Sequence, residues 1–571
     1  MTITKESFVD LQEKYNKVKK LLEEDSKLDP PNEPHLSKYS ARQILIGMKA
    51  SIENLMRSQS SEGPDTLKLT GAVYLYLGMV SLDTEEPSTG EKYLEKCKEI
   101  IEKYADIPEF ILITLNMYNQ FGILWYHREP EKSQVYLDKA EELYLHYKEK
   151  SAPPIDISDL FQTNIETFNS DIALKNMEKI YTLTLYYLAQ RQLQMNDYDP
   201  IDWALNAATL SQFFMENNGF KQARHHLAAS SYMLQKHEKE LNEITEQDEV
   251  YEAKMETFKH RSADVARCWS KYGLILLARS KERLLNHTDD IDTNCPLSTD
   301  LSKLELAADS TISQEDLKNL DFKGIDVTLF ESQITDQFVL TLNDARKVFL
   351  NSQQWTIKAQ EYYTLDDLAS DYIEIVLDQS QLYLNLLFFE DCPENQAKLH
   401  KRRVNLLEGI LDKVNSQYYL QYCRQVWFEL GRTYGDILDI KAEKLRESKG
   451  RPAPQTLTKI NSLSEKSIHH YLNFINSLKN KITGELPAKI QDDEKAYLQA
   501  LFHIAALYGR YITLDKELQI KKTESSLEYH RLFKEYCDKN TKAKELVPME
   551  YEICKEMVDL LPIKILKLKR S

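Results

Sequence analysis

The clearest periodic pattern of apolar and polar positions lies in the stretch 203–234. Apolar residues recur there at helical spacing on both sides of Asn217-Asn218-Gly219, a sequence typical of a tight turn. After the turn, Ala223, Leu227 and Ser230 are spaced four and then three residues apart, so that small and large side chains share one stripe. Small residues let two helices approach closely. The pattern predicts two antiparallel helices that need neighbours to cover their apolar faces.

The same kind of unit recurs along the chain. The first helix of a tetratricopeptide repeat (TPR) has the consensus W-x2-L-G-x2-Y, and Trp427, Leu430, Gly431 and Tyr434 match its four positions. Related forms of the motif carry a glycine at the same step, at Gly78, Gly122 and Gly273. A glycine inside a helix costs about 1 kcal/mol relative to alanine, so its recurrence indicates close packing against a neighbouring helix. We predict TPR-like repeats; the alternative is an irregular helical bundle.

The composition favours a fold without strands. The 571 residues include only 15 glycines and 17 prolines, and few runs of β-branched residues alternate with polar ones. A chain of this length exceeds one ordinary globular core. We therefore expect an all-α, TPR-like right-handed helical-repeat solenoid in two lobes joined by a linker. The expected parts are N-terminal helices in 1–65, an N-terminal TPR-like lobe in 66–285, an acidic linker in 286–326 and a C-terminal TPR-like lobe in 327–571.

The charge of the chain narrows the range of partners. The formal net charge of -17 at pH 7 argues against nucleic acid and against anionic membranes. An acidic surface suits a basic protein partner, although solubility alone also explains such a charge. No apolar signal core begins the chain and no run of 18 apolar residues follows, so we expect no membrane insertion and a location in the cytoplasm. The seven cysteines contain no C-x2-C pair, which fits reduced thiols.

Motifs for catalysis or metal binding are not evident. No P-loop, G-x-G-x-x-G, H-E-x-x-H, G-x-S-x-G or EF-hand loop occurs, so we predict neither an enzyme nor a cofactor. The adjacent pairs His225-His226 and His469-His470 point about 100° apart on a helix and do not easily share a metal. The basic run 398–403 has two interpretations, a solvated helix face or a contact for phosphate or an acidic partner. We favour the solvated face.

Several short segments occur in a characteristic order along the chain. They are SKYSAR at 37–42, DTEE at 83–86, GILW at 122–125, LYYLAQ at 185–190, NAATLSQF at 206–213, ARCW at 266–269, HKRR at 400–403, QYYL at 417–420, KEMV at 555–558 and LLP at 560–562. In this order they resemble the KIF-binding protein family, the kinesin-binding TPR proteins of animal cells. The resemblance implies a non-enzymatic protein that grips the motor domains of particular kinesins and prevents them from binding microtubules.

The resemblance also implies which residues contact the motor, in a concave groove near the junction of the two lobes. Carried over onto the matching motifs, these residues are Tyr187 and Gln190 in LYYLAQ, Gln192 just beyond it, Thr209 in NAATLSQF and Arg261 shortly before ARCW. One departure concerns this region. The family pattern has a further turn and helix between LYYLAQ and RQL, whereas here Gln190 runs directly into Arg191. We expect the LYYLAQ helix to lack its usual partner and the groove beside Tyr187 to be disturbed.

Charge offers a physical account of the implied inhibition. Kinesin motors dock on the acidic surface of tubulin through a basic face, so an acidic groove would compete for that face by mimicry. We predict a cytoskeleton-associated inhibitor of selected kinesins that regulates microtubule-based transport, including axonal and mitochondrial transport, cytoskeleton organisation, axon growth and neuronal differentiation. The alternative is a general TPR adaptor that links kinesin to cargo or mitochondria. We expect a monomer, because a solenoid with polar end caps needs no second copy.

Overall fold

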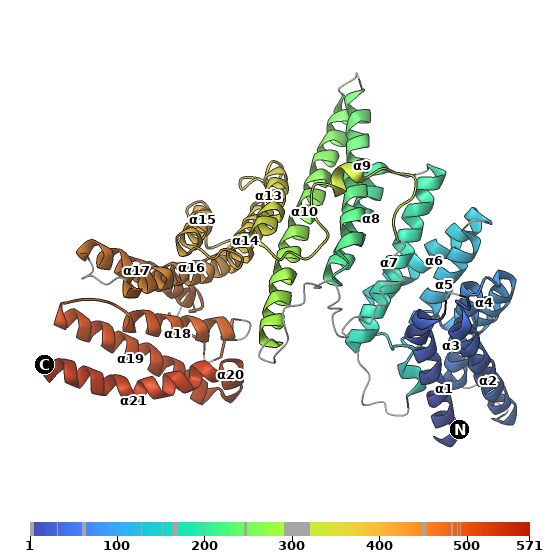
Figure 1. The fold of residues 1–571 in the computed structure, drawn as a ribbon, viewed down its shortest axis with the longest axis horizontal. Coiled ribbons are helices and arrows are strands. Elements are labelled where there is room, and N and C mark those ends of the chain that lie inside the picture. Colours follow the sequence, from blue (N-terminus) through green and yellow to red (C-terminus); the bar gives the residue numbers. More distant parts are fainter. Residues whose placement is uncertain are drawn as a thin grey trace. The chain divides into compact units, whose positions relative to one another are not determined.

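Helices form most of the chain in a computed structural model. The structure describes residues 5–30, 32–59, 64–126, 128–150, 152–162, 170–196, 198–244, 248–290, 320–447, 453–480, 484–487, 489–490 and 493–570. No strand occurs within these residues, and successive helices pack on one another along the chain (Figure 1). The prediction of an all-α chain of helical repeats is confirmed.

Two compact units divide the chain. The first comprises Met1–Cys268 with Pro296–Gln337, and the second comprises Trp269–Cys295 with Phe338–Ser571. The division falls inside helix α10 (Glu249–Asp290), which runs unbroken from one unit into the other. The sequence instead places the change of lobe in 286–326. Within that segment, 291–319 lies outside the described residues, and 320–326 belongs to the first unit.

The first unit is formed by helices that pack mainly in consecutive pairs, α1 with α2, α3 with α4, α5 with α6 and α8 with α9. Prolines at positions 87, 130 and 200 begin the helices α4, α6 and α8, where the missing backbone N–H breaks no intrahelical hydrogen bond. The helices are α1 (Lys5–Glu23), α2 (Leu36–Gln59), α3 (Pro64–Asp83), α4 (Pro87–Ile101), α5 (Ile111–Trp125), α6 (Pro130–Glu149), α7 (Ser170–Met195), α8 (Pro200–Glu216), α9 (Phe220–Asn242), the first part of α10, and α12 (Thr328–Glu331), with short 3-10 turns at Asp25–Leu28, Glu102–Tyr104 and Asp159–Phe161.

Helix α7 stands between two of these pairs. It continues through Gln190 and Arg191 without a break, and it packs on α5, α6 and α8. Asn119 of α5 donates a hydrogen bond to the Ile180 carbonyl of α7 at 2.8 Å and accepts one from the Thr184 hydroxyl at 2.8 Å. The helix therefore has neighbours on both sides, although it forms no hairpin with a helix of its own.

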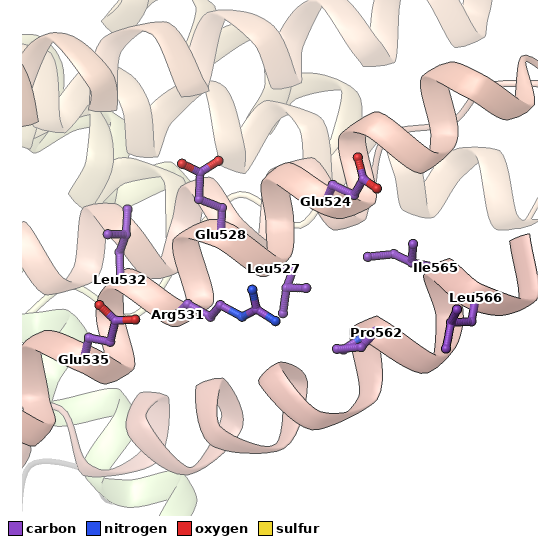
Figure 2. Close-up of a pocket in the computed structure, with 9 residues that line it drawn as sticks. All are labelled: Glu524, Leu527, Glu528, Arg531, Leu532, Glu535, Pro562, Ile565 and Leu566. Atoms are coloured by element: carbon purple, nitrogen blue, oxygen red, sulfur yellow. The ribbon is translucent and has the colours of Figure 1, made fainter. Parts of the chain in front are cut away.

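The second unit continues the same arrangement from the later part of α10. Its other helices are α13 (Leu342–Gln360), α14 (Ala369–Leu387), α15 (Pro393–Leu411), α16 (Leu420–Glu447), α17 (Pro454–Ser477), α18 (Glu494–Gly509), α19 (Lys516–Lys539), α20 (Thr541–Leu546) and α21 (Pro548–Arg570). Leu527 of α19 packs with Leu561 and Ile565 of α21. Figure 2 shows the groove of about 620 Å³ beside this contact, where three glutamates of α19 line one side.

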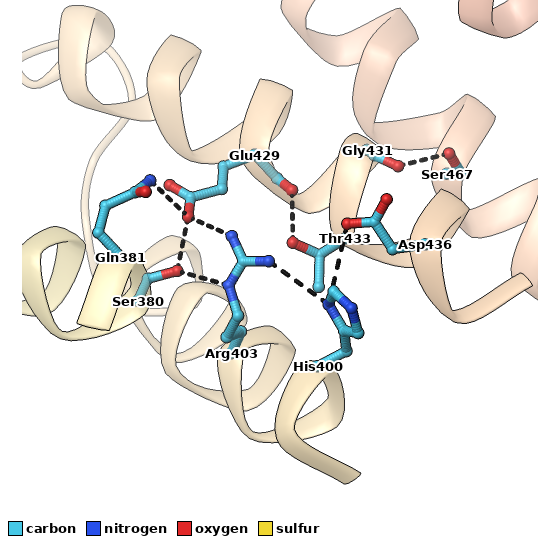
Figure 3. Close-up of polar contacts among 9 residues, drawn as sticks. All are labelled: Ser380, Gln381, His400, Arg403, Glu429, Gly431, Thr433, Asp436 and Ser467. Carbon is cyan, nitrogen blue, oxygen red and sulfur yellow. Dashed lines mark hydrogen bonds and ion pairs between the residues drawn. The ribbon is translucent and has the colours of Figure 1, made fainter. Parts of the chain in front are cut away.

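The repeat glycines lie where two helices approach most closely. A Cβ atom added to Gly122 would lie 2.5 Å from the Leu137 side chain, and one added to Gly431 would lie 2.9 Å from the Tyr471 ring. In both repeats a serine four residues before the large side chain donates to the glycine carbonyl, Ser133 at 2.7 Å and Ser467 at 2.6 Å (Figure 3 shows the second bond). The close packing inferred from the recurring glycines is confirmed at these positions.

Candidate partner-binding surface

Helix α7 carries three of the five residues predicted to contact a partner. Tyr187 and Gln192 are half-buried, whereas Gln190 is only 4% exposed. The Gln190 amide forms two hydrogen bonds with the backbone of Lys323. Its Oε1 accepts from the Lys323 N–H at 2.8 Å, and its Nε2 donates to the Lys323 carbonyl at 3.3 Å. The Gln190 side chain is therefore engaged in a contact within the first unit.

Lys323 belongs to a non-helical segment, Leu320–Asp326, which bends at Lys323 and Gly324 and which we call the strap. The strap packs on α7, α8 and α9 through Phe322, which is 4% exposed. The Phe322 ring centroid lies 5.5 Å from that of Tyr186, 4.8 Å from that of Trp203 and 4.8 Å from that of His226. The Tyr186 hydroxyl also donates to the carbonyl that precedes Phe322, at 3.2 Å. Burying a phenylalanine side chain contributes about 1.5–3 kcal/mol, so the strap has an apolar anchor besides its hydrogen bonds.

Two consecutive polar residues of α9, Arg224 and His225, bind the strap and the residues that follow it. His225 Nε2 accepts a hydrogen bond from the Phe322 N–H at 2.8 Å, and His225 Nδ1 lies 2.8 Å from Glu331 Oε1. Because Nε2 acts as an acceptor, the ring proton is on Nδ1 and is donated to the Glu331 carboxylate. Arg224 forms a largely shielded ion pair with Asp336 at 2.9 Å. Helix α12, which contains Glu331, accordingly lies against α9 (Figure 1).

His226, the other member of the pair, is fully buried beneath the strap. Within the described residues neither of its ring nitrogens has a hydrogen-bond partner. Burial and the neighbouring His225 lower the pKa of His226 well below its usual value, so the ring is neutral at physiological pH. The ring stacks on Phe214 with centroids 4.9 Å apart. His226 therefore acts as an aromatic packing group under Phe322. Nowhere in the described part of the chain do three or more His, Cys, Asp or Glu side chains gather as metal ligands.

Tyr187 lies on the outer side of an aromatic group on α7. Its ring contacts Tyr186 edge-on at 5.2 Å and Tyr126 of α5's C-terminal end edge-on at 6.1 Å. These contacts fix the ring plane and leave part of the ring exposed. Tyr187 is thus presented rigidly, which lowers the entropy lost when a partner packs against it.

The remaining predicted residues lie on α8 and α10. Thr209 is exposed on α8, and its hydroxyl donates to the Leu205 carbonyl at 2.9 Å. Arg261 is partly exposed on α10 and pairs with Asp264 at 3.0 Å. Gln212, one turn after Thr209, donates to Cys268 Sγ at 3.5 Å, which places this face of α8 beside α10. All five predicted residues therefore lie in the first unit, on α7, α8 and α10.

Sequence reasoning missed the strap and the residues that receive it. The sequence predicts that the segment LDFKGID belongs to an acidic linker, and the signal against that prediction is its three apolar residues, Leu320, Phe322 and Ile325. His225 and His226 were assessed only as metal ligands. Nothing in the local sequence indicates that Phe322 and Trp203 meet. The spacing of apolar residues reveals contacts along one helix, whereas these two residues are separated by 118 others.

Together these observations define an all-α helical-repeat protein, a class that presents surfaces of adjacent helices to other proteins. Residues 201–568 match the family described as "KIF-1 binding protein C terminal". The KIF-binding protein of Drosophila melanogaster is 34% identical over 600 aligned residues, which cover 100% of this chain and 98% of that protein. The human KIF-binding protein is 32% identical, with 94% of each chain covered. The chain belongs to the KIF-binding protein family.

A solved structure titled "Cryo-EM map of KIFBP" is also similar to this chain. It shares 26% sequence identity, with 98% of this chain and 100% of that chain covered and a TM-score of 0.47.

Proposed function

We propose that this chain binds kinesin motor domains and keeps selected kinesins from attaching to microtubules. The observation that carries the proposal is the full-length similarity to relatives named KIF-binding protein, such as the Drosophila protein. The contact residues in this proposal are Tyr187, Gln190, Gln192, Thr209 and Arg261. Four of them are at least partly exposed, on α7, α8 and α10.

Gln190 differs from the other four residues because its side chain is buried and hydrogen-bonded to the strap. To contact a motor directly, its amide must leave the two hydrogen bonds with Lys323. Each such bond contributes about 0.5–1.5 kcal/mol, so the exchange costs little if the motor supplies equivalent partners. A motor that binds the Gln190 amide would therefore release the strap from that residue.

Charge supports competition with microtubules. A basic motor face that docks on acidic tubulin is attracted by a chain with a net charge of -17. Attraction of this kind weakens with salt, because the screening length is about 8 Å at physiological ionic strength. Selectivity among kinesins then depends on shape and on polar contacts such as those of Thr209 and Arg261, since acidity alone attracts many basic proteins.

The proposed role is regulation of microtubule-based transport, cytoskeleton organisation and axon growth by a non-enzymatic, cytoplasmic protein associated with the cytoskeleton. The second candidate is an adaptor that links kinesin to cargo or mitochondria without blocking the motor. The two differ in whether a bound motor still attaches to microtubules. No helix in the described part of the chain combines the length and apolarity needed to cross a bilayer.

A direct binding experiment tests the proposed surface. Thr209 and Thr458 are both exposed on helices, and each hydroxyl donates to the carbonyl four residues earlier, at 2.9 and 3.1 Å. Thr458 lies on α17 of the second unit, outside the proposed surface. We expect T209R to weaken binding of a purified kinesin motor domain about tenfold or more in isothermal titration calorimetry, and T458R to leave it unchanged. Equal binding by both variants would exclude this surface.

A further inference from the structure

The basic run 398–403 divides between two faces of α15. His400 and Arg403 point into the second unit, where Arg403 is 1% exposed. The Arg403 guanidinium pairs with Glu429 of α16 at 2.7 Å and donates to the Ser380 hydroxyl of α14 at 3.3 Å (Figure 3). A buried charge needs such partners, because leaving one partner unpaired costs several kcal/mol. This inner face is therefore structural, and the solvated-face interpretation does not apply to it.

Lys398 and Arg402, one turn apart, lie on the other face of α15 and line a groove of about 300 Å³. The opposite wall is formed by α13, and the end of α14 contributes Leu386. The groove has an apolar interior, since Phe349 and Leu386 are each 4% exposed. Leu350 also lines it and is 56% exposed. The surface thus combines apolar groups with cations at its edge.

The cations of the groove are unequally engaged. Arg346 pairs at 2.9 Å with Glu390, whose side chain is 6% exposed, so these two charges offset each other. Within the described ranges, Lys398 donates only to the neutral amide oxygen of Asn395, at 3.4 Å. For Arg402 the described residues offer no hydrogen bond or ion pair. Two positive charges one turn apart therefore remain at the edge of the groove, in a chain whose net charge is -17.

We propose that this groove binds an acidic amphipathic helix of a partner protein. Apolar side chains of the helix would cover Leu342, Leu350 and Leu399, which line the groove and are at least partly exposed. Two carboxylates one turn apart on the helix would face Lys398 and Arg402. Helices bind in apolar grooves through residues spaced three and four apart, and complementary charges at the edge fix their register. Lipid recognition by charge uses clusters of four to eight basic residues, whereas this groove offers two with an apolar interior.

This partner differs in kind from the one proposed for the first unit. A kinesin motor domain is attracted through a basic face, whereas the groove on α13 and α15 selects an acidic segment. The chain would then join two proteins of opposite charge. The groove lies wholly within the second unit, so this proposal does not depend on the proposed motor-binding surface.

Selection from a naive library of helical peptides displayed on phage tests the proposal with the full chain. We expect the enriched peptides to carry a net negative charge and leucine-type residues at three- and four-residue spacing. In fluorescence anisotropy, binding of such a peptide should weaken about tenfold in K398E and R402E, because each reversal replaces an attraction with a repulsion. Leu350→Glu should abolish binding.

Lys401 provides the matched control, because it is exposed on the same helix and does not line the groove. K401E changes the charge by the same amount and should bind the peptide as the unchanged chain does. Equal thermal midpoints for K398E, R402E and K401E would show that each variant is folded. The proposal is overturned if no acidic peptide is enriched, if all three reversals weaken binding equally, or if only vesicles containing phosphatidylinositol bisphosphate bind.

Discussion

Gln190 of α7 and Lys323 of the strap are joined by two hydrogen bonds, at 2.8 and 3.3 Å, although they lie 133 residues apart in the sequence. The bonds satisfy both backbone groups of Lys323 with one side-chain amide. A change at either residue therefore acts on the other. This relationship connects a residue proposed to contact the motor with a segment that the sequence assigned to a linker.

Removing the anchor of the strap should release it. Phe322→Ala deletes a ring that packs among Tyr186, Trp203 and His226, and comparable truncations cost about 3–5 kcal/mol. We expect amide hydrogen exchange in 320–326 to accelerate and the free energy of unfolding of the first unit to fall. Lys323→Ala is the control, because the Lys323 side chain is exposed and its backbone bonds remain. Similar exchange in both variants would contradict the anchoring role.

Loss of the Gln190 amide should produce a smaller effect in the same segment. Gln190→Ala removes both hydrogen bonds to the Lys323 backbone, and each such bond contributes about 0.5–1.5 kcal/mol. We expect faster exchange of the Lys323 amide measured by NMR. Gln192→Ala, two residues along the same helix, should leave that exchange rate unchanged because Gln192 is not bonded to the strap. A strap that exchanges equally in both variants would show that the Gln190 bonds contribute nothing.

The recurring glycines were predictable from the sequence because the repeat is a local and periodic feature. In both repeats the serine lies four residues before the large side chain, although the glycine that they meet lies 11 residues before the serine in one repeat and 36 in the other. The strap was not predictable, since its position depends on Phe322 meeting Trp203 and on His225 accepting from a distant backbone N–H. The buried face of α15 follows apolar residues at helical spacing, including Ala397, Val404 and Leu407, but the partner of Arg403 was hidden because Glu429 of α16 lies 26 residues away.

Substitution by alanine should change the stability of the second unit in opposite directions at two of its glycines. At Gly431 a Cβ atom would lie 2.9 Å from the Tyr471 ring, whereas at Gly409 no atom lies within 4 Å. We expect Gly431→Ala to destabilise the unit by about 1–3 kcal/mol through overpacking. Gly409→Ala, inside α15, should stabilise it by up to about 1 kcal/mol through helix propensity. Urea unfolding measures both, and stabilisation by Gly431→Ala would refute the close approach of α16 and α17.

Acid should destabilise the second unit through three buried histidines. Burial lowers the pKa of His400, His470 and His530 to about 4 from the ordinary value of 6.5. The unfolded chain therefore takes up protons before the folded one as the pH falls. The neutral rings contribute fully to the free energy of unfolding above pH 6.5, and this contribution is lost as the pH falls towards about 4.

For each histidine the loss is at most about 1.4 kcal/mol per pH unit in this range. Urea unfolding at pH 7, 6 and 5 should show the free energy of unfolding decreasing, with a smaller slope in His530→Gln. An unchanged slope in that variant would mean that His530 is accessible to protons in the folded state.

The central claim is that this chain removes selected kinesin motors from microtubules by binding them. The most direct test is microtubule co-sedimentation of a panel of purified kinesin motor domains. Each motor is sedimented with and without the chain, at two salt concentrations. The account predicts that some motors leave the pellet, that they leave it less completely at high salt, and that T209R restores them to the pellet while T458R does not. If every motor still sediments, or if the chain itself sediments with motor and microtubule, the inhibitor account is wrong, and the second outcome would favour the adaptor.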